Sequence, residues 1–109
     1  MDAPTMTGTE NQIQWAEQIK PAVAAEFERI RKAFEAVAAG QPEADQEDTL
    51  AILAIIEEKR IEVMSNQSAG YFIQYWRELG DQVRWMILHD ERYMKISVRS
   101  RLRKKPIAF

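Results

Sequence analysis

The stretch from Trp15 to Val37, WAEQIKPAVAAEFERIRKAFEAV, decides the fold of this 109-residue chain. Steps of three and four residues place side chains on one side of an α-helix. Large apolar residues recur at such steps: Trp15, Ile19, Val23, Phe27, Ile30, Phe34 and Val37. Pro21 lies inside this stripe and lacks the amide hydrogen that would bond to Glu17, so a kink is expected near Lys20. Because the apolar phase continues past Pro21, the sequence predicts one long, kinked helix.

Local signals mark both ends of this helix. Thr7 and Glu10 have the spacing of a capping box, in which the hydroxyl and the carboxylate bond free amides of the first turn, and Thr9 is an alternative cap. Gly40 ends the pattern as a C-terminal cap. We therefore expect a helix over residues 9–39 after a flexible N-terminus, residues 1–8.

Two further helices follow. Asp45 and Asp48 suit the start of a second helix over residues 46–64, whose segment LAILAII is apolar nearly all round and predicts a central position. A third helix is expected over residues 68–89, capped by Ser65 or Ser68 and weakened at Gly80-Asp81. Its apolar stripe consists of Phe72, Trp76, Leu79, Val83 and Met86, of which Phe72 and Trp76 are expected in the core.

Charge divides the chain in two. Residues 1–90 carry 8 Lys and Arg against 16 Asp and Glu, a net charge of −8, whereas residues 91–109 carry 7 against 1, a net charge of +6. We take residues 9–90 as an acidic helical domain and residues 91–109 as a basic C-terminal segment. Without cysteine, a signal peptide or an apolar run long enough to span a bilayer, the chain is expected to be cytoplasmic.

The basic C-terminal segment allows several interpretations. Met94, Val98 and Leu102 have helical spacing, while Met94, Ile96 and Val98 alternate as in a strand, so its structure stays open. Its cations suit nucleic acid or another polyanion through counterion release. They are Arg99, Arg101, Arg103, Lys104 and Lys105. Alternatively the segment docks on the acidic body of its own or a neighbouring copy, which the apolar end Ile107–Phe109 favours, or it has no specific role.

Few residues suggest catalysis or metal binding. His89 has no second histidine or cysteine near it in sequence, and we interpret it as a surface residue. Glu58 and Glu62 stand four apart, the spacing of paired helical carboxylates that hold Mg²⁺ in all-α nucleotide pyrophosphohydrolases, but Lys59 and Arg60 between them favour a solvated, ion-paired face. Motifs for nucleophilic, phosphate-binding or zinc-protease chemistry are missing from the sequence. We expect no enzyme, metal or cofactor.

The aromatic residues suggest a contact surface instead. Tyr71, Tyr75 and Trp85 lie in a cluster that either stacks bases or forms a protein interface, and Phe109 is a further candidate for a protein interface. Long apolar stripes on so few helices leave one face uncovered, which favours a homodimer.

The segment TGTENQIQWAEQIK, Thr7–Lys20, resembles a T-G-[ST]-E-x-Q-I-x-W-A-E-x-I opening found in small uncharacterised bacterial and phage-encoded proteins. In those proteins a segment A-x-W-W-I follows, and AGYFI, Ala69–Ile73, is similar to it with Tyr71 and Phe72 in the tryptophan places. The likeness covers about 14 residues, or 19 with the second segment. It implies a phage or mobile-element accessory protein, a class that includes small acidic inhibitors of host defence nucleoproteins.

Together these features predict an all-α fold of three main helices in a small bundle, followed by the basic segment. As function we expect non-catalytic binding through contacts with a protein partner or with a second copy, including inhibition of a host nucleoprotein. The alternative is nucleic-acid binding through the basic segment. No membrane partner is expected.

Overall fold

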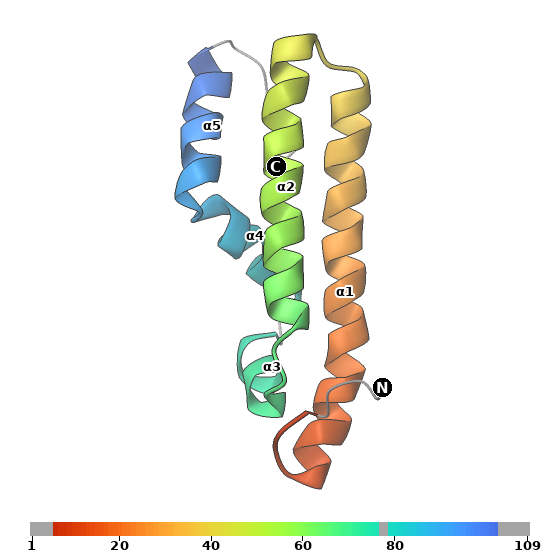
Figure 1. The fold of residues 1–109 in the computed structure, drawn as a ribbon. Coiled ribbons are helices and arrows are strands. Elements are labelled where there is room, and N and C mark those ends of the chain that lie inside the picture. The colour runs from red at the N-terminus through yellow and green to blue at the C-terminus, as the bar shows by residue number, and fades with distance from the viewer. Residues whose placement is uncertain (1–5, 77–78, 103–109) are drawn as a thin grey trace.

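The computed structural model describes residues 6–76 and 79–102. The all-α class is confirmed, but the described residues form five helices where three main ones were predicted. They are α1 (Glu10–Ala39), α2 (Glu43–Met64), α3 (Ala69–Tyr75), α4 (Leu79–Leu88) and α5 (Glu91–Leu102). The two long helices, α1 and α2, run side by side as a hairpin, with α5 on the other side of α2 (Figure 1).

The hairpin turns where the sequence predicted it. Helix α1 is continuous through Pro21, and the amide of Gly40 caps its end by donating to the carbonyl of Val37 at 3.2 Å. Helix α2 starts at Glu43, three residues before the predicted residue 46, with Pro42 in the extended conformation at its N-cap. The backbone angle φ of −60° that proline imposes suits this position, so the helix begins directly after it.

Thr9, not Thr7, caps α1. The hydroxyl of Thr9 accepts from the amide of Gln12, and the Gln12 side chain accepts from the amide of Thr9, so that Gln12 takes the place predicted for Glu10. Thr7 is engaged elsewhere, since its amide donates to the carbonyl of Gln67 at 2.7 Å and its carbonyl accepts from the amide of Ala69 at 2.9 Å. The segment before α1 is therefore bonded to the loop between α2 and α3.

Gly8 allows this contact. Its φ of +144° is one that side chains disfavour, and an added Cβ would lie 3.1 Å from the Cβ of Ala69. The segment before α1 thus meets the start of α3 through the bridge between Thr7 and Ser68 and the hydrogen bond from the Ala69 amide to the Thr7 carbonyl. Residues 6–8, which the sequence placed in a flexible N-terminus, include the buried Met6 and this bridge.

The third predicted helix is divided. Instead of one helix over residues 68–89, α3 ends at Tyr75 and α4 begins at Leu79, so the interruption precedes the predicted weak point at Gly80-Asp81. Ser68 caps α3, as one of the two predicted alternatives, by accepting from the amide of Tyr71. The division lets the short α3 pack on α1 while α4 crosses behind α2 toward α5 (Figure 1).

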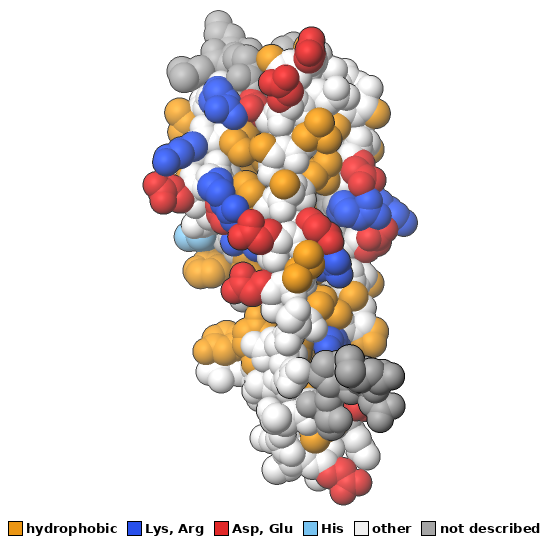
Figure 2. Space-filling model, in the orientation of Figure 1, with side chains coloured by type: hydrophobic (Ala, Val, Ile, Leu, Met, Phe, Trp, Pro, Cys, Tyr) orange, Lys and Arg blue, Asp and Glu red, His pale blue; other side chains and the backbone are white. Residues whose placement is uncertain are grey.

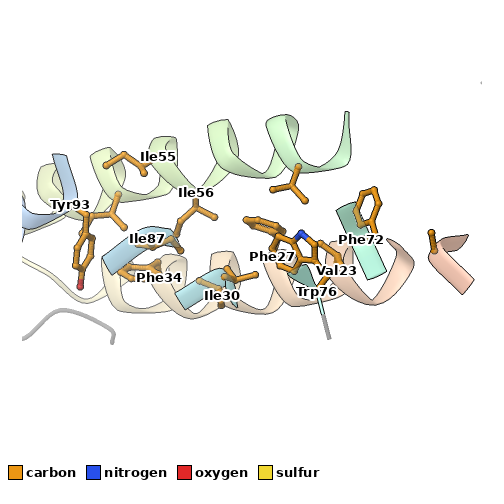
Figure 3. Close-up of a cluster of buried hydrophobic side chains, with 14 of the residues drawn as sticks. Val23, Phe27, Ile30, Phe34, Ile55, Ile56, Phe72, Trp76, Ile87 and Tyr93 are labelled. Atoms are coloured by element: carbon orange, nitrogen blue, oxygen red, sulfur yellow. The ribbon is translucent and has the colours of Figure 1, made fainter. Parts of the chain in front are cut away.

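The core lies between the hairpin and the three shorter helices (Figure 3). Phe27 of α1 and Trp76 meet with ring centroids 5.9 Å apart, and both side chains are buried, as is Phe72. The predicted core positions Phe72 and Trp76 are thereby confirmed. From α2, α4 and α5 the core receives Ile52, Ile55, Ile56, Val63, Val83, Ile87, Tyr93 and Ile96.

Candidate interaction surfaces

The helical interpretation of residues 91–102 is confirmed, and α5 packs along α2. The strand alternative is wrong because Tyr93 and Ile96, three residues apart, both point into the core. Two ion pairs tie α5 to α2: Arg99 Nε lies 3.1 Å from Asp48 Oδ1, and Arg92 Nη1 lies 2.8 Å from Glu58 Oε2. Since the later residue of α5 meets the earlier residue of α2, the two helices are antiparallel.

A cluster of charges joins the start of α5 to the middle of α2. Asp90 Oδ2 lies 3.0 Å from Lys59 Nζ and 3.0 Å from Arg92 Nη2, and the side chains of Asp90 and Lys59 are 10% and 16% exposed. Hydrogen bonds from Arg92 and Lys59 hold the pKa of the Asp90 carboxyl well below its usual range. The same contacts raise the pKa of Arg92, and Arg92 lowers that of Glu58. Asp90 thus remains ionised and fixes the corner between α4 and α5.

Ion pairs within the protein engage part of the basic segment that the sequence suggested for polyanion binding. Arg99, the first of the five predicted residues, bonds Asp48, and Lys95 lies 3.3 Å from Glu91. Arg101 stands in the last turn of α5. Arg103, Lys104 and Lys105, together with the predicted interface residue Phe109, lie outside the described residues. The described start of the basic segment is therefore docked on the acidic body.

The outer side of α2 and α5 carries exposed apolar side chains. Leu50 of α2 and Met94 and Val98 of α5 are 55%, 53% and 52% exposed. At 100° per residue, Val98 stands about 140° around its helix from Tyr93 and about 160° from Ile96, so its side faces away from the core. A shallow hollow of about 380 Å³ lies on this side, lined by Glu91, Met94, Lys95 and Val98.

Exposed aromatic side chains take part in two separate ring pairs, Tyr71 with Tyr75 and Trp85 with His89. Tyr75 and Trp85 are 51% and 57% exposed, while Tyr71 is half-buried and packs against the core, with its ring 5.2 Å from Phe72 and 5.5 Å from Tyr75. His89 is exposed as expected and stacks on Trp85 with ring centroids 4.5 Å apart. Its Nδ1 lies 2.9 Å from the Trp85 carbonyl and donates to it in the tautomer protonated there.

Of the acidic pair considered for a metal, Glu58 is bonded to Arg92 and Glu62 is exposed. The adjacent Glu57 is bonded to Arg60 at 2.5 Å. Within residues 6–76 and 79–102, no three His, Cys, Asp or Glu side chains gather as a metal site would require. Among the described helices, none combines the length and apolar character needed to cross a lipid bilayer.

Sequence reasoning missed Leu50, Met94 and Val98 as surface residues. The signal for Leu50 was present in LAILAII, since a helix apolar all round exposes some apolar residues unless it is enclosed. Met94 and Val98 were noted only for their spacing. Recognising that Tyr93 and Ile96 occupy the opposite side of the same helix would have identified both as exposed.

Comparison with known proteins identifies no relative of this chain. No protein-family model matches the chain, and neither does any curated protein or any solved structure.

Proposed function

We propose that this protein is a non-catalytic binding protein that acts through protein–protein contacts. The observation that carries the proposal is the exposure of large apolar side chains on the outer side of α2 and α5, where Leu50, Met94 and Val98 stay half-exposed. Exposed apolar patches rimmed by polar residues mark interaction sites in soluble proteins. Figure 2 shows hydrophobic side chains over the upper part of α2 and, among charged side chains, over α5.

The charges around this surface favour a protein partner over nucleic acid. Arg92 and Arg99 bond Glu58 and Asp48, so a phosphate would have to compete with these carboxylates for the two cations. Exposed carboxylates of α2, Glu43 and Glu47, stand near the same surface and repel a polyanion.

Affinity capture from the native host tests the proposal. The full-length chain is compared with Val98→Asp, which places a charge on the apolar surface, and with Trp15→Asp, a matched control because Trp15 is 50% exposed on α1. We expect a protein that the wild type and Trp15→Asp retain and Val98→Asp loses, with no change after nuclease treatment. Capture that disappears with nuclease, or that Val98→Asp retains in full, contradicts the proposal.

The cellular setting of the proposal rests on the resemblance of Thr7–Lys20 to phage-encoded proteins. Under it, the protein is a phage or mobile-element accessory that inhibits a host nucleoprotein. The capture experiment addresses this setting as well, because the partner would then be a component of a host defence complex. A partner encoded by the element itself would contradict inhibition of the host.

A further inference from the structure

We propose that a second copy of this chain covers the outer side of α2 and α5, and that the two copies form an antiparallel four-helix bundle in which α2 of each copy packs on α5 of the other. The inference deepens the proposed function by naming the partner of its apolar surface, and it rests on that function. The surface concerned, called the α2–α5 face below, consists of Leu50 and Ala54 of α2 and Met94 and Val98 of α5.

The two apolar stripes form one face. The ion pairs of Arg99 with Asp48 and of Arg92 with Glu58 set the register of the antiparallel helices. This register places Val98 level with Leu50, and Met94 level with Ala54. On both helices the buried residues point to the same core and the ion-paired residues point to the neighbouring helix, so at 100° per residue the exposed apolar residues of each helix lie in the half-turn away from the core.

Helix α5 needs a cover on this side. It is only 12 residues long, and apolar residues stand on two opposite sides of it: Tyr93 and Ile96 in the core, Met94 and Val98 outside. Short helices gain their stability from packing more than from propensity, so a cover on Met94 and Val98 would stabilise α5.

Charge selects which helix of the second copy lies on which. Next to the apolar residues, α2 carries the exposed carboxylates of Glu43 and Glu47, whereas the last turns of α5 carry Arg99 and Arg101 in the sequence. Packing α2 on the partner's α2 would bring carboxylates together, which opposes association. Packing α2 on the partner's α5 brings opposite charges together at the same end of the bundle.

Symmetry and size agree with this arrangement. A two-fold axis parallel to the helices and lying in the interface places α2 opposite the partner's α5, and the reverse, so the contact closes as a dimer. Residues keep their level under this operation. Leu50 then faces the partner's Val98, and the small Ala54 faces the partner's Met94, which lets large and small side chains interdigitate. All four neighbouring helix pairs are antiparallel, as in many four-helix bundles.

The mass of the full-length chain, measured by sedimentation over a range of concentrations, is the first test. We expect a concentration-dependent dimer, weakened at least tenfold by Val98→Asp and by Leu50→Asp and unchanged by Trp15→Asp. Far-UV circular dichroism of each variant checks that it remains folded, since all three positions are exposed. A wild type that stays monomeric at high micromolar concentration overturns the proposal. So does a full-length Phe109→Asp variant that dimerises where the wild type does not, because the chain's own end then covers the face.

Cysteine pairing tests the arrangement itself, since the natural chain has no cysteine. Two single variants, Leu50→Cys and Val98→Cys, are oxidised separately and as an equimolar mixture. We expect disulfide-linked dimers chiefly in the mixture, because residue 50 of one copy faces residue 98 of the other. Efficient cross-linking of Leu50→Cys alone shows α2 on the partner's α2 and overturns the arrangement.

The charge-reversing substitution Glu47→Lys distinguishes the same two arrangements without cross-linking. We expect it to weaken the dimer several-fold at low salt, since Glu47 loses its attraction to the basic end of the partner's α5. A tighter dimer would mean that Glu47 had faced carboxylates. Should the chain prove monomeric while Val98→Asp still loses a captured protein, the proposed function stands and the self-association falls.

Discussion

Helix α2 is held to its two neighbours, α1 and α5, in different ways. Toward α1 the helix buries Ile52 and Ile56 against Phe27 and Phe34, all at most 1% exposed. Toward α5 it offers ion pairs through Asp48, Glu58 and Lys59, and α5 contributes only Tyr93 and Ile96 to the described core. The hairpin is thus built on extensive apolar burial, whereas α5 is held by two buried side chains together with ion pairs. We therefore expect α5 to open locally at a lower free energy than the hairpin of α1 and α2.

The largest expected effect comes from the core of the hairpin. Phe27→Ala removes a fully buried ring that packs against Trp76 and leaves a cavity, so we expect the free energy of unfolding to fall by about 3–5 kcal/mol. Urea denaturation followed by circular dichroism measures it. The control is Trp15→Ala on the same helix, where a half-exposed side chain predicts a change of at most about 0.5 kcal/mol. Equal losses at both positions would refute the contrast.

The hairpin was also the region that the sequence predicted best. The stripe from Trp15 to Val37 and the cap at Gly40 identified α1, since both signals are local. Within that stripe, however, Trp15 is exposed, because periodicity names a side of a helix and does not say how far the covering elements extend along it. The predicted bend at Pro21 stays a prediction.

The features that the sequence did not predict depend on contacts between residues far apart in the sequence. The division of the third helix near Trp76 follows from packing on α1 and α2, which no local breaker announces. Thr7 could cap α1 by spacing, yet its backbone pairs with Gln67 and Ala69, and only the folded chain brings these together. Likewise the docking of Arg99 on Asp48 spans 51 positions, so the sequence alone does not decide between docking and polyanion binding.

The charge cluster at Asp90 should have the next largest effect. Asp90→Asn leaves the mostly buried ammonium of Lys59 without its carboxylate, and we expect a loss of about 1–3 kcal/mol at pH 7 in urea unfolding. Glu91→Gln is the matched control, because the neighbouring Glu91 side chain is 82% exposed. If Glu91→Gln lowers the free energy of unfolding as much as Asp90→Asn does, the charge cluster contributes no more to stability than an exposed ion pair.

The same cluster predicts a pH dependence. Because the pKa of folded Asp90 lies below its unfolded value of about 3.9, the folded state gains stability from this group above that pH and loses it as the pH falls further. We therefore expect the difference in stability between wild type and Asp90→Asn to be constant from pH 7 to about pH 5 and to shrink below about pH 4. Unfolding curves at these pH values measure it, and a difference that grows on acidification would contradict the assignment.

Breaking the contact between Arg99 and Asp48 should have a smaller effect, confined to α5. Arg99 is 56% exposed at its side chain, so screening by water limits the contribution to about 1 kcal/mol. We expect Arg99→Ala to speed amide hydrogen exchange in α5 severalfold and to leave α1 unchanged. Lys95→Ala, which removes an exposed pair within α5, serves as control. Faster exchange throughout α1 would mean that α5 and the hairpin unfold as one unit.

The smallest effect is expected where the sequence drew most attention, in the cations beyond α5. If the basic segment serves to dock α5 on the acidic body, then changing Arg103, Lys104 and Lys105 together to glutamine should leave any DNA or RNA binding unchanged at 150 mM salt. A protein that neutralises several phosphates binds far more tightly at 50 mM salt, so labelled oligonucleotides are titrated at both concentrations. Binding at 50 mM that weakens steeply with salt and disappears in the glutamine variant would instead establish the nucleic-acid alternative. That result would extend the contrast between the two regions, since α5 would then hold in place a cationic end directed at another molecule.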